Sequence, residues 1–225
     1  MNVKACLKSM RLRTLPLSLA GVLAGIALSA PKAGTGAPVI VFLILTTVFL
    51  QILSNLSNEL GDTLHGTDTA ERQGIKYSIQ EGEMTVKQMK RLIAVIAGLC
   101  CLCGLLMVRC SFGTLLAVEP VCLLALGAAA IWAAMKYTLG DNPYGYRGLG
   151  DIFVFIFFGL VSVMGAGYVC SHTVEPVWIL PSTATSLPFL RYFSQFSAVI
   201  AFGVNGVVIS FPKAIFEIIE NILEI

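Results

Sequence analysis

The sequence predicts an all-α fold, a polytopic bundle of transmembrane helices with about seven spans. Three observations support this prediction. The 225 residues are 56% hydrophobic and 12% charged, whereas water-soluble domains carry about 25% charged residues. Long stretches contain no charge at all, and the basic residues gather in alternate loops between them. We therefore expect a single integral membrane domain over residues 1–225 and exclude a water-soluble globule.

The charge-free stretches define the predicted spans. A hydrocarbon core of about 30 Å needs roughly 20 apolar residues at 1.5 Å of rise each. In chain order the predicted spans are residues 14–31, 33–58, 92–108, 120–135, 152–174, 176–190 and 192–212. The sixth is short and contains Pro181 and Pro188, so we expect either a kinked crossing or a re-entrant segment there.

The basic residues predict the orientation of the bundle. With a cytoplasmic N-terminus, alternate loops place Lys4, Lys8, Arg11, Arg13, Arg72, Lys76, Lys87, Lys90, Arg91, Lys136, Arg147 and Arg191 inside, and Lys32, Arg109 and Lys213 outside. This is the positive-inside distribution, which the opposite topology would reverse. We expect a multi-pass protein of the cytoplasmic (inner) membrane. A cleaved signal peptide ending near Ala30 is the less favoured alternative.

Other kinds of site are not favoured by the composition. Most of the seven cysteines lie in apolar stretches without His or carboxylate neighbours, so we interpret them as small packing residues. A net charge of +2 that is spread over loops forms no basic patch. The expected partner is therefore the lipid bilayer, with no nucleic acid.

The loop of residues 59–91 is long for a connection between two membrane helices, and its first part is rich in oxygen-bearing side chains. If the second span continues as a helix, residues at i, i+3, i+4 and i+7 share one face: Asn55, Asn58, Glu59 and Asp62. Gly66 then permits a sharp turn that brings Asp68 back toward them. The bland alternative is a solvated helix end at the membrane boundary.

Converging carboxylates and carboxamides repel one another unless a cation lies between them. Hard oxygen ligands with few carboxylates suit Mg²⁺, so the cluster of Asn55, Asn58, Glu59, Asp62 and Asp68 is a candidate Mg²⁺ site. Arg72 and Lys76 follow in the same loop, and acidic groups on Mg²⁺ with nearby cations form a diphosphate clamp. His65 is read as a solvated loop residue.

A second polar loop, residues 136–151, combines Gly, Pro and Tyr at a density that indicates a tight, shaped turn. Its tyrosines Tyr144 and Tyr146 are either interfacial anchors or the wall of a cavity. In the second case they line it together with Asp151, an ionisable group at the mouth of the fifth span.

Three ordered motifs resemble the 1,4-dihydroxy-2-naphthoate polyprenyltransferases, the menaquinone branch of the UbiA-type intramembrane prenyltransferase family. They are Ser9–Pro16; Gln51–Asp62 with Gly66 and Asp68; and Pro143–Asp151 followed by Phe157–Gly159 and Ser162–Gly165. The resemblance covers residues 9–183. It implies a helical membrane bundle whose active site opens to the cytoplasm.

The resemblance implies a reaction: Mg²⁺-dependent transfer of a polyprenyl group from polyprenyl diphosphate to dihydroxynaphthoate, with loss of CO₂, giving demethylmenaquinone after oxidation. The implied catalytic residues are Asp62, Asp68 and Asp151, and the implied metal ligands are Asn58, Glu59, Asp62 and Asp68. The implied substrate-binding residues are Arg11, Asn55, Arg72, Lys76, Tyr144 and Tyr146. Two positions differ from the family. Glu59 stands for the usual Asp, and Tyr77 stands where an Arg is expected, with Lys76 adjacent as a substitute.

The resemblance is lost after Thr183. The family continues into a second Asp-rich motif, but no Asp follows Asp151 here. We expect a C-terminally truncated or frameshifted member in which residues 184–225 form a divergent segment and which has little or no activity. The alternatives are a catalytically impaired fragment of that enzyme and a small-solute membrane transporter, since glycine-rich spans also suit moving bundles.

Overall fold

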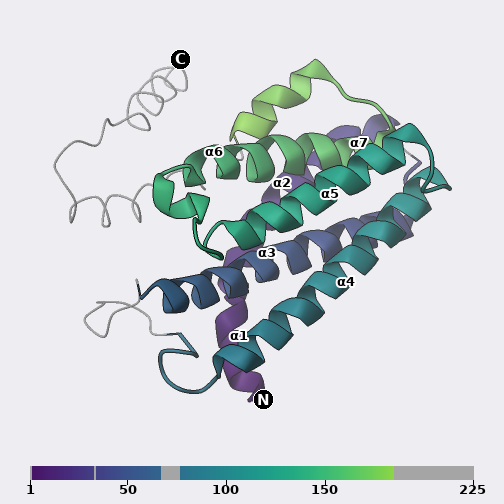
Figure 1. The fold of residues 1–225 in the computed structure, drawn as a ribbon. Coiled ribbons are helices and arrows are strands. Elements are labelled where there is room, and N and C mark those ends of the chain that lie inside the picture. Colours follow the sequence, from purple (N-terminus) through teal and green to yellow (C-terminus); the bar gives the residue numbers. More distant parts are fainter. Residues whose placement is uncertain (1, 33, 67–76, 185–225) are drawn as a thin grey trace.

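Helices account for all the regular structure in the described part of the chain, residues 2–32, 34–66 and 77–184 of a computed structural model (Figure 1). The elements are α1 (Val3–Met10), η1 (Leu12–Thr14), α2 (Leu15–Ser29), η2 (Ala30–Lys32), α3 (Ala37–His65), α4 (Val86–Phe112), α5 (Val118–Lys136), η3 (Tyr144–Arg147), α6 (Gly150–Val154), the π-helix η4 (Phe155–Gly165), α7 (Ala166–Ser171) and η5 (Pro176–Trp178). The predicted all-α class is confirmed.

Five helical stretches of the described residues are long and apolar enough to cross a membrane: Val3–Ser29, Ala37–His65, Val86–Phe112, Val118–Lys136 and Gly150–Ser171. They correspond to the first five predicted spans, so the multi-pass prediction is confirmed. The sixth is described only over residues 176–184, where helical residues follow η5. The seventh, residues 192–212, lies outside the described residues.

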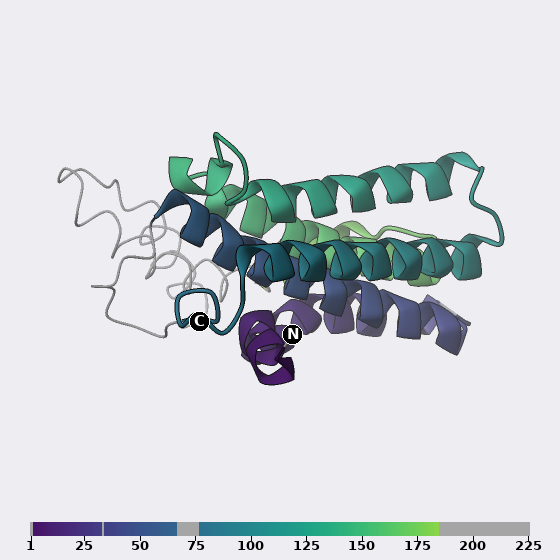
Figure 2. The same cartoon turned by 60° about the horizontal axis from the view of Figure 1, so that its bottom comes forward.

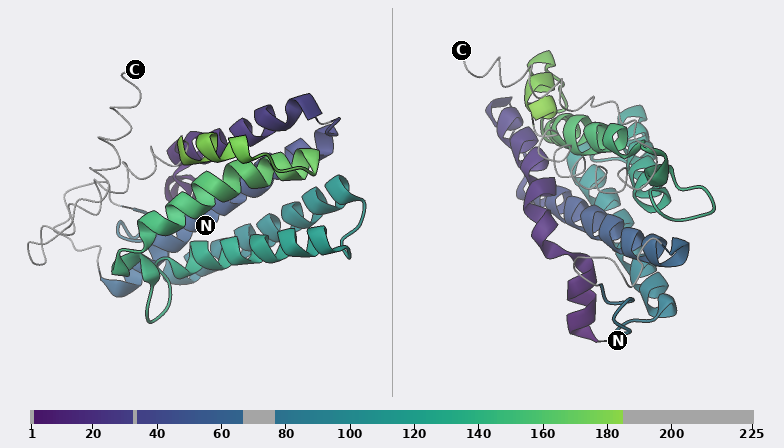
Figure 3. Two further views of the ribbon diagram at one scale, coloured as in Figure 1. Left: turned by 90° about the horizontal axis from the view of Figure 1, so that it is seen from above. Right: turned by 90° about the vertical axis from the view of Figure 1, so that its left-hand side faces the viewer.

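The helices form two groups. In the first group α3, α4 and α5 pack together, and each runs antiparallel to the one before it in the chain (Figure 2). In the second group α2 packs against η4 and α7, as both views of Figure 3 show, and it also contacts α3. The first stretch is not one straight helix, because Arg11 has a left-handed backbone with φ 49°. Consequently α1 runs at a steep angle to the other helices (Figure 1).

The ends of α3 and α4 follow from local sequence. α4 begins after Thr85, which forms a capping box with Gln88: Gln88 N donates to Thr85 Oγ1 (3.2 Å) and Thr85 N donates to Gln88 Oε1 (2.8 Å). α3 ends at Gly66, whose φ of 65° is a conformation that glycine adopts without a Cβ clash. Because α3 continues to His65, the predicted helical extension through Asp62 is confirmed.

Two glycines of α2 allow a very close contact with the π-helix. A Cβ at Gly21 would lie 1.8 Å from Ser162 Oγ, and one at Gly25 would lie 2.3 Å from Val163 O. In lipid, apolar side chains gain little by leaving the acyl chains, so helices associate through small residues that let backbones approach. The spacing of these glycines, i and i+4, is typical of such contacts. They fix α2 against the helix that begins at the second polar loop.

An apolar core fills the end of the bundle that carries the polar loops. Its buried members come from α1, the second half of α3, the start of α4 and the segment just before α4, and include Ala5, Cys6, Leu53, Leu56, Leu60, Met84, Met89, Leu92 and Ile93. This core holds α1 and the start of α4 against the polar end of α3.

Candidate active site

The polar end of α3 meets the loop between α5 and α6. Tyr146 Oη donates a hydrogen bond to Asp62 Oδ1 at 2.7 Å, although the two residues are 84 positions apart in the chain. Asp62 is half-buried, whereas Tyr146 is exposed. The structure thus joins a carboxylate from the first predicted motif to a tyrosine from the second polar loop.

Thr138 and Gly61 hold these two elements in contact. The Thr138 side chain is 2% exposed, and its hydroxyl lies 2.9 Å from Ser57 O and 3.2 Å from Asn58 Oδ1. A Cβ at Gly61 would lie 2.5 Å from both the Cβ and the carbonyl oxygen of Thr138. The second loop therefore rests on the backbone of α3, directly beside the residue that precedes Asp62.

His65 adds a further link between α3 and the second loop. Its Nδ1 lies 2.9 Å from Gly61 O within α3, and its Nε2 lies 3.1 Å from Gly140 O. Its ring also meets the ring of Tyr146 edge-on, with centroids 5.4 Å apart. The sequence suggests a solvated loop histidine here, whereas the structure places His65 in the last turn of α3 as a bridging residue.

Asn55, a predicted substrate-binding residue, lies on the α1 side of the same helix face. Its Nδ2 donates to Met10 O (2.9 Å) and to Thr14 Oγ1 (3.0 Å). Gln51 Nε2 donates to the same Thr14 hydroxyl at 3.2 Å. Asn55 is 5% exposed, and its amide nitrogen ties α3 to the connection between α1 and α2.

Arg11, also a predicted substrate-binding residue, lies at that connection. Its guanidinium carbon is 3.7 Å from the centroid of the Tyr77 ring, a cation–π contact. Tyr77 occupies the position where the family resemblance leads one to expect an arginine. Its ring is buried and contacts the cation of Arg11, the residue that follows α1.

The residues after Tyr77 are bound to α1. Ser78, which is fully buried, donates from its hydroxyl to Ala5 O at 2.9 Å and accepts from the Ser9 hydroxyl at 3.0 Å. Lys8 forms an ion pair with Glu81. These contacts place α1 and the segment of residues 77–81 together at the edge of the candidate site.

Glu59, a predicted metal ligand, is fully buried and reaches the same segment. Its Oε1 accepts a hydrogen bond from Ile79 N at 3.1 Å. Its Oε2 is buried and has no hydrogen-bond partner within the described residues. One carboxylate oxygen therefore anchors the backbone of residue 79, and only Oε2 is left for a metal ion.

Replacing Glu59 by alanine is expected to destabilise the protein by about 2–4 kcal/mol, because it leaves the Ile79 amide unsatisfied and opens a cavity. Glu59→Gln keeps a carbonyl acceptor and should lose less. Thermal unfolding in detergent measures the difference, with the exposed Glu83→Ala as control. A similar fall in melting temperature for Glu83→Ala and Glu59→Ala would contradict the anchoring role.

Tyr144 and Tyr137 pack the second loop. Tyr144 Oη donates to Ala133 O at 2.7 Å, and its ring stacks on Phe153 with centroids 4.0 Å apart. The Tyr137 ring meets Tyr144 edge-on at 5.4 Å. Of the two predicted tyrosines, Tyr146 therefore contacts the α3 carboxylate, and Tyr144 stabilises the loop.

Burial raises the pKa of both hydroxyls of this pair, Tyr137 and Tyr144. The charges of Tyr144, Asp151 and Asp62 raise the pKa of Tyr137 further. Carboxylates from both motifs thus lie near enough to Tyr137 to act on it.

Alkaline pH is expected to destabilise the fold through these tyrosines. Because their folded pKa values lie above the unfolded value of about 10, the unfolded chain loses its protons first as pH rises. The buried, protonated tyrosines therefore contribute their full share to the free energy of unfolding below about pH 10, and this share is lost as the pH rises toward their folded pKa. Melting temperatures across this range should fall less steeply for Tyr137→Phe than for wild type. Equal slopes for both proteins would contradict this expectation.

Asp151 opens α6 at the mouth of the fifth span, where the sequence predicts it. Its Oδ1 is buried and has no hydrogen-bond partner among residues that the structure describes. The other predicted site residues, Asp68, Arg72 and Lys76, lie outside the described residues. Within residues 2–32, 34–66 and 77–184 no group of three or more His, Cys, Asp and Glu side chains is close enough to hold a metal ion.

Sequence reasoning missed Thr138, Tyr137 and His65 as parts of the site. Each acts through a contact with a residue far away in the chain or in the next element, which residue spacing alone does not reveal. The one usable signal was the density of Gly and Pro around them, which predicts a shaped loop but not its partner.

An apolar helical bundle with oxygen-bearing side chains at one end defines an integral membrane protein whose polar site lies at the membrane edge. Comparison with known families narrows this class. The chain belongs to the UbiA prenyltransferase family, whose model matches residues 18–204.

Curated relatives share this part of the chain. The 1,4-dihydroxy-2-naphthoate octaprenyltransferases of Escherichia coli (strain K12) and Haemophilus influenzae are 43% and 38% identical over 83% of the chain. A UbiA prenyltransferase domain-containing protein of Dictyostelium discoideum is 30% identical over 68% of it and 46% of its own length. The chain spans 60% of the length of the two bacterial relatives. No solved structure matches the chain.

Proposed function

We propose that the chain transfers a polyprenyl group from a polyprenyl diphosphate to 1,4-dihydroxy-2-naphthoate, with loss of CO₂, in menaquinone biosynthesis. The hydrogen bond between Tyr146 and Asp62 carries this proposal, because it brings residues of two polar loops to one place at the membrane edge. The identity to naphthoate octaprenyltransferases supports the choice of acceptor.

In the proposed reaction the allylic C–O bond breaks and the diphosphate leaves with the bonding electrons. The ring carbon that bears the carboxylate attacks the allylic carbon, and loss of CO₂ restores the aromatic ring. Tyr146 is hydrogen-bonded to Asp62, and the role proposed for its ring is to stabilise the developing allylic cation. The packing of Tyr144 and Tyr137 keeps the loop that carries Tyr146 in a fixed shape, which limits the reorganisation needed during the reaction.

Mg²⁺ is the metal that we propose for this site. Asn58 and Asp62 offer hard oxygen donors one helical turn apart on α3. The buried, unpartnered Oε2 of Glu59 fits a cation site as well. Asp68 would complete the set. A bound Mg²⁺ would supply positive charge to offset that of the departing diphosphate.

The cations proposed to hold the diphosphate are Arg11, Arg72 and Lys76. Of these Arg11 is described, and its guanidinium lies over the ring of Tyr77. We further propose that the chain is one integral domain of the cytoplasmic membrane with its N-terminus in the cytoplasm, because that orientation places most basic residues inside.

Membranes containing the full chain provide the test, with labelled polyprenyl diphosphate, dihydroxynaphthoate and Mg²⁺ as added components. The expected result is a prenylated naphthoquinol that requires both substrates, is lost with a chelator and returns with Mg²⁺ but not with Ca²⁺. Absence of product at saturating substrates would count against the proposal. Substrate-independent uptake of small solutes by sealed vesicles would then favour the transporter class.

A further inference from the structure

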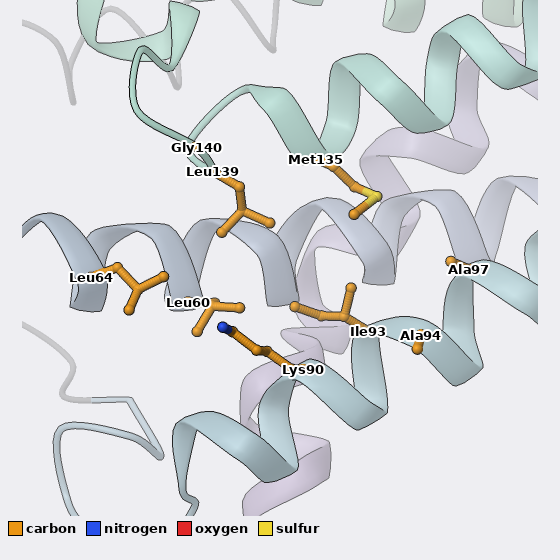
Figure 4. Close-up of a pocket in the computed structure, with 9 residues that line it drawn as sticks. All are labelled: Leu60, Leu64, Lys90, Ile93, Ala94, Ala97, Met135, Leu139 and Gly140. Atoms are coloured by element: carbon orange, nitrogen blue, oxygen red, sulfur yellow. The ribbon is translucent and has the colours of Figure 1, made fainter.

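A groove of about 390 Å³ lies between α4 and α5, with α3 as its floor (Figure 4). Its lining is almost entirely apolar and includes Leu60, Leu64, Ile93, Met135 and Leu139, together with the charged side chain of Lys90. Figure 4 shows Lys90 extending across the groove toward Leu60. Such a groove combines a hydrocarbon-like wall with one cation.

The groove and the candidate active site both border the second loop at Gly140, but they lie on different faces of α3. Successive residues of an α-helix are rotated by about 100°, so the directions of Leu60 and Asp62 around α3 differ by about 160°. Leu60 lines the groove, and Asp62 contacts Tyr146 on the opposite face. A ligand in the groove would therefore not occupy the place proposed for the diphosphate.

The charge of the groove is concentrated at one end. Lys90 lies in the second turn of α4, near the polar loops, whereas Ala97 lines the groove two turns further into the apolar part of that helix. A second ammonium group lies at the same end. A Cβ at Gly140, which lines the groove, would be 2.5 Å from Lys136 Nζ.

Neither lysine has an acidic partner among the residues that the structure describes. Within the described part of the chain the ion pair found is Lys8–Glu81, and it involves neither Lys90 nor Lys136. Two unpaired ammonium groups at the end of an apolar groove are complementary to an anionic head with a hydrocarbon chain. A peptide would fit less well, since the lining offers few partners for its backbone amides.

We infer that the groove binds an anionic phospholipid of the surrounding bilayer. Its phosphate lies between Lys90 and Lys136, and one acyl chain lies along Leu60, Ile93 and Met135. The basic end of the groove is at the end of the bundle where the polar loops lie, which is the level of lipid head groups. Each lysine near such a head group is expected to strengthen binding about fivefold.

Native mass spectrometry of the detergent-solubilised full chain, titrated with phosphatidylglycerol or phosphatidylcholine, tests this inference. Wild type should retain phosphatidylglycerol preferentially. Lys90→Ala and Lys136→Ala should each weaken that binding about fivefold, and Lys90→Arg should preserve it. Arg91→Ala is the matched control: the same charge is removed from the next residue of α4, which does not line the groove, and a change below about twofold is expected.

A second variant tests the place of the acyl chain. Ala94→Phe fills the groove and keeps both lysines, so phosphatidylglycerol binding should fall while the helical circular dichroism is unchanged. Three results would overturn the inference: equal losses for Lys90→Ala and Arg91→Ala, no preference of wild type for the anionic lipid, or wild-type binding by Ala94→Phe. Because none of these measurements involves prenyl transfer, failure of the proposed function leaves the outcome unaffected.

Discussion

Asp62→Ala is expected to lower prenyl transfer by about a hundredfold to a thousandfold, the effect of removing one preorganised electrostatic group from an active site. The substitution removes a proposed ligand of Mg²⁺ and also the acceptor of the Tyr146 hydrogen bond. The measurement is the initial rate of product formation by membranes at equal protein level, over a range of Mg²⁺ concentrations.

Two further variants separate charge from anchoring at this position. Asp62→Asn keeps an oxygen acceptor for Tyr146 but removes the negative charge, so it should lose nearly as much activity as alanine while the protein keeps its melting temperature. Asp141→Ala removes an exposed carboxylate from the second loop and should retain the wild-type rate within about twofold. Wild-type activity in Asp62→Asn would show that the charge has no catalytic role.

Gly25→Ala is expected to destabilise the bundle by about 3 kcal/mol, at the upper end of what overpacking costs. The added methyl carbon would lie 2.3 Å from Val163 O and 2.8 Å from Ala166 Cβ. Neither neighbour can rotate away, since one is backbone and the other is a methyl group fixed to backbone. α2 must therefore move off the π-helix, and thermal unfolding in detergent should show a markedly lower melting temperature.

Gly98→Ala is the matched control for this substitution. Gly98 lies in the interior of α4, and nothing lies within 4 Å of the position that its Cβ would take. Alanine there should be neutral or stabilising by up to about 1 kcal/mol, because it favours the helix. If both glycine variants behave alike, the close contact of α2 is not what determines stability.

Much of the fold was predictable because the bilayer imposes a fixed length on its helices. The charge-free stretches gave the first five spans, and the 3.6-residue period placed Asn58 and Asp62 on one face of α3. Even the turn at Gly66 follows from residue type alone. These features depend on the thickness of the bilayer and on residues close in the chain, and both can be inferred from sequence patterns.

The contacts across the site were not predictable, because periodicity identifies the face of a helix but not what covers it. Thr138 contacts Asn58, which is 80 residues away in the chain, and no pattern in either segment indicates that the two meet. The spacing of Glu59 and Asp62 predicts that both face the metal site, yet Glu59 Oε1 accepts a hydrogen bond from the Ile79 amide. The four-residue spacing of Gly21 and Gly25 indicates close helix packing, but it does not indicate that the partner is the π-helix.

The length of α3 decides whether its polar end lies in the hydrocarbon core of the membrane or in water. Its 29 residues extend about 43 Å at 1.5 Å per residue, whereas the hydrocarbon core is about 30 Å thick. The helix is therefore longer than the core, and its polar last turns, with Asp62 and His65, suit the aqueous boundary. In the proposed reaction, a substrate with a charged head and a long apolar tail would keep its head in water and its tail in the hydrocarbon.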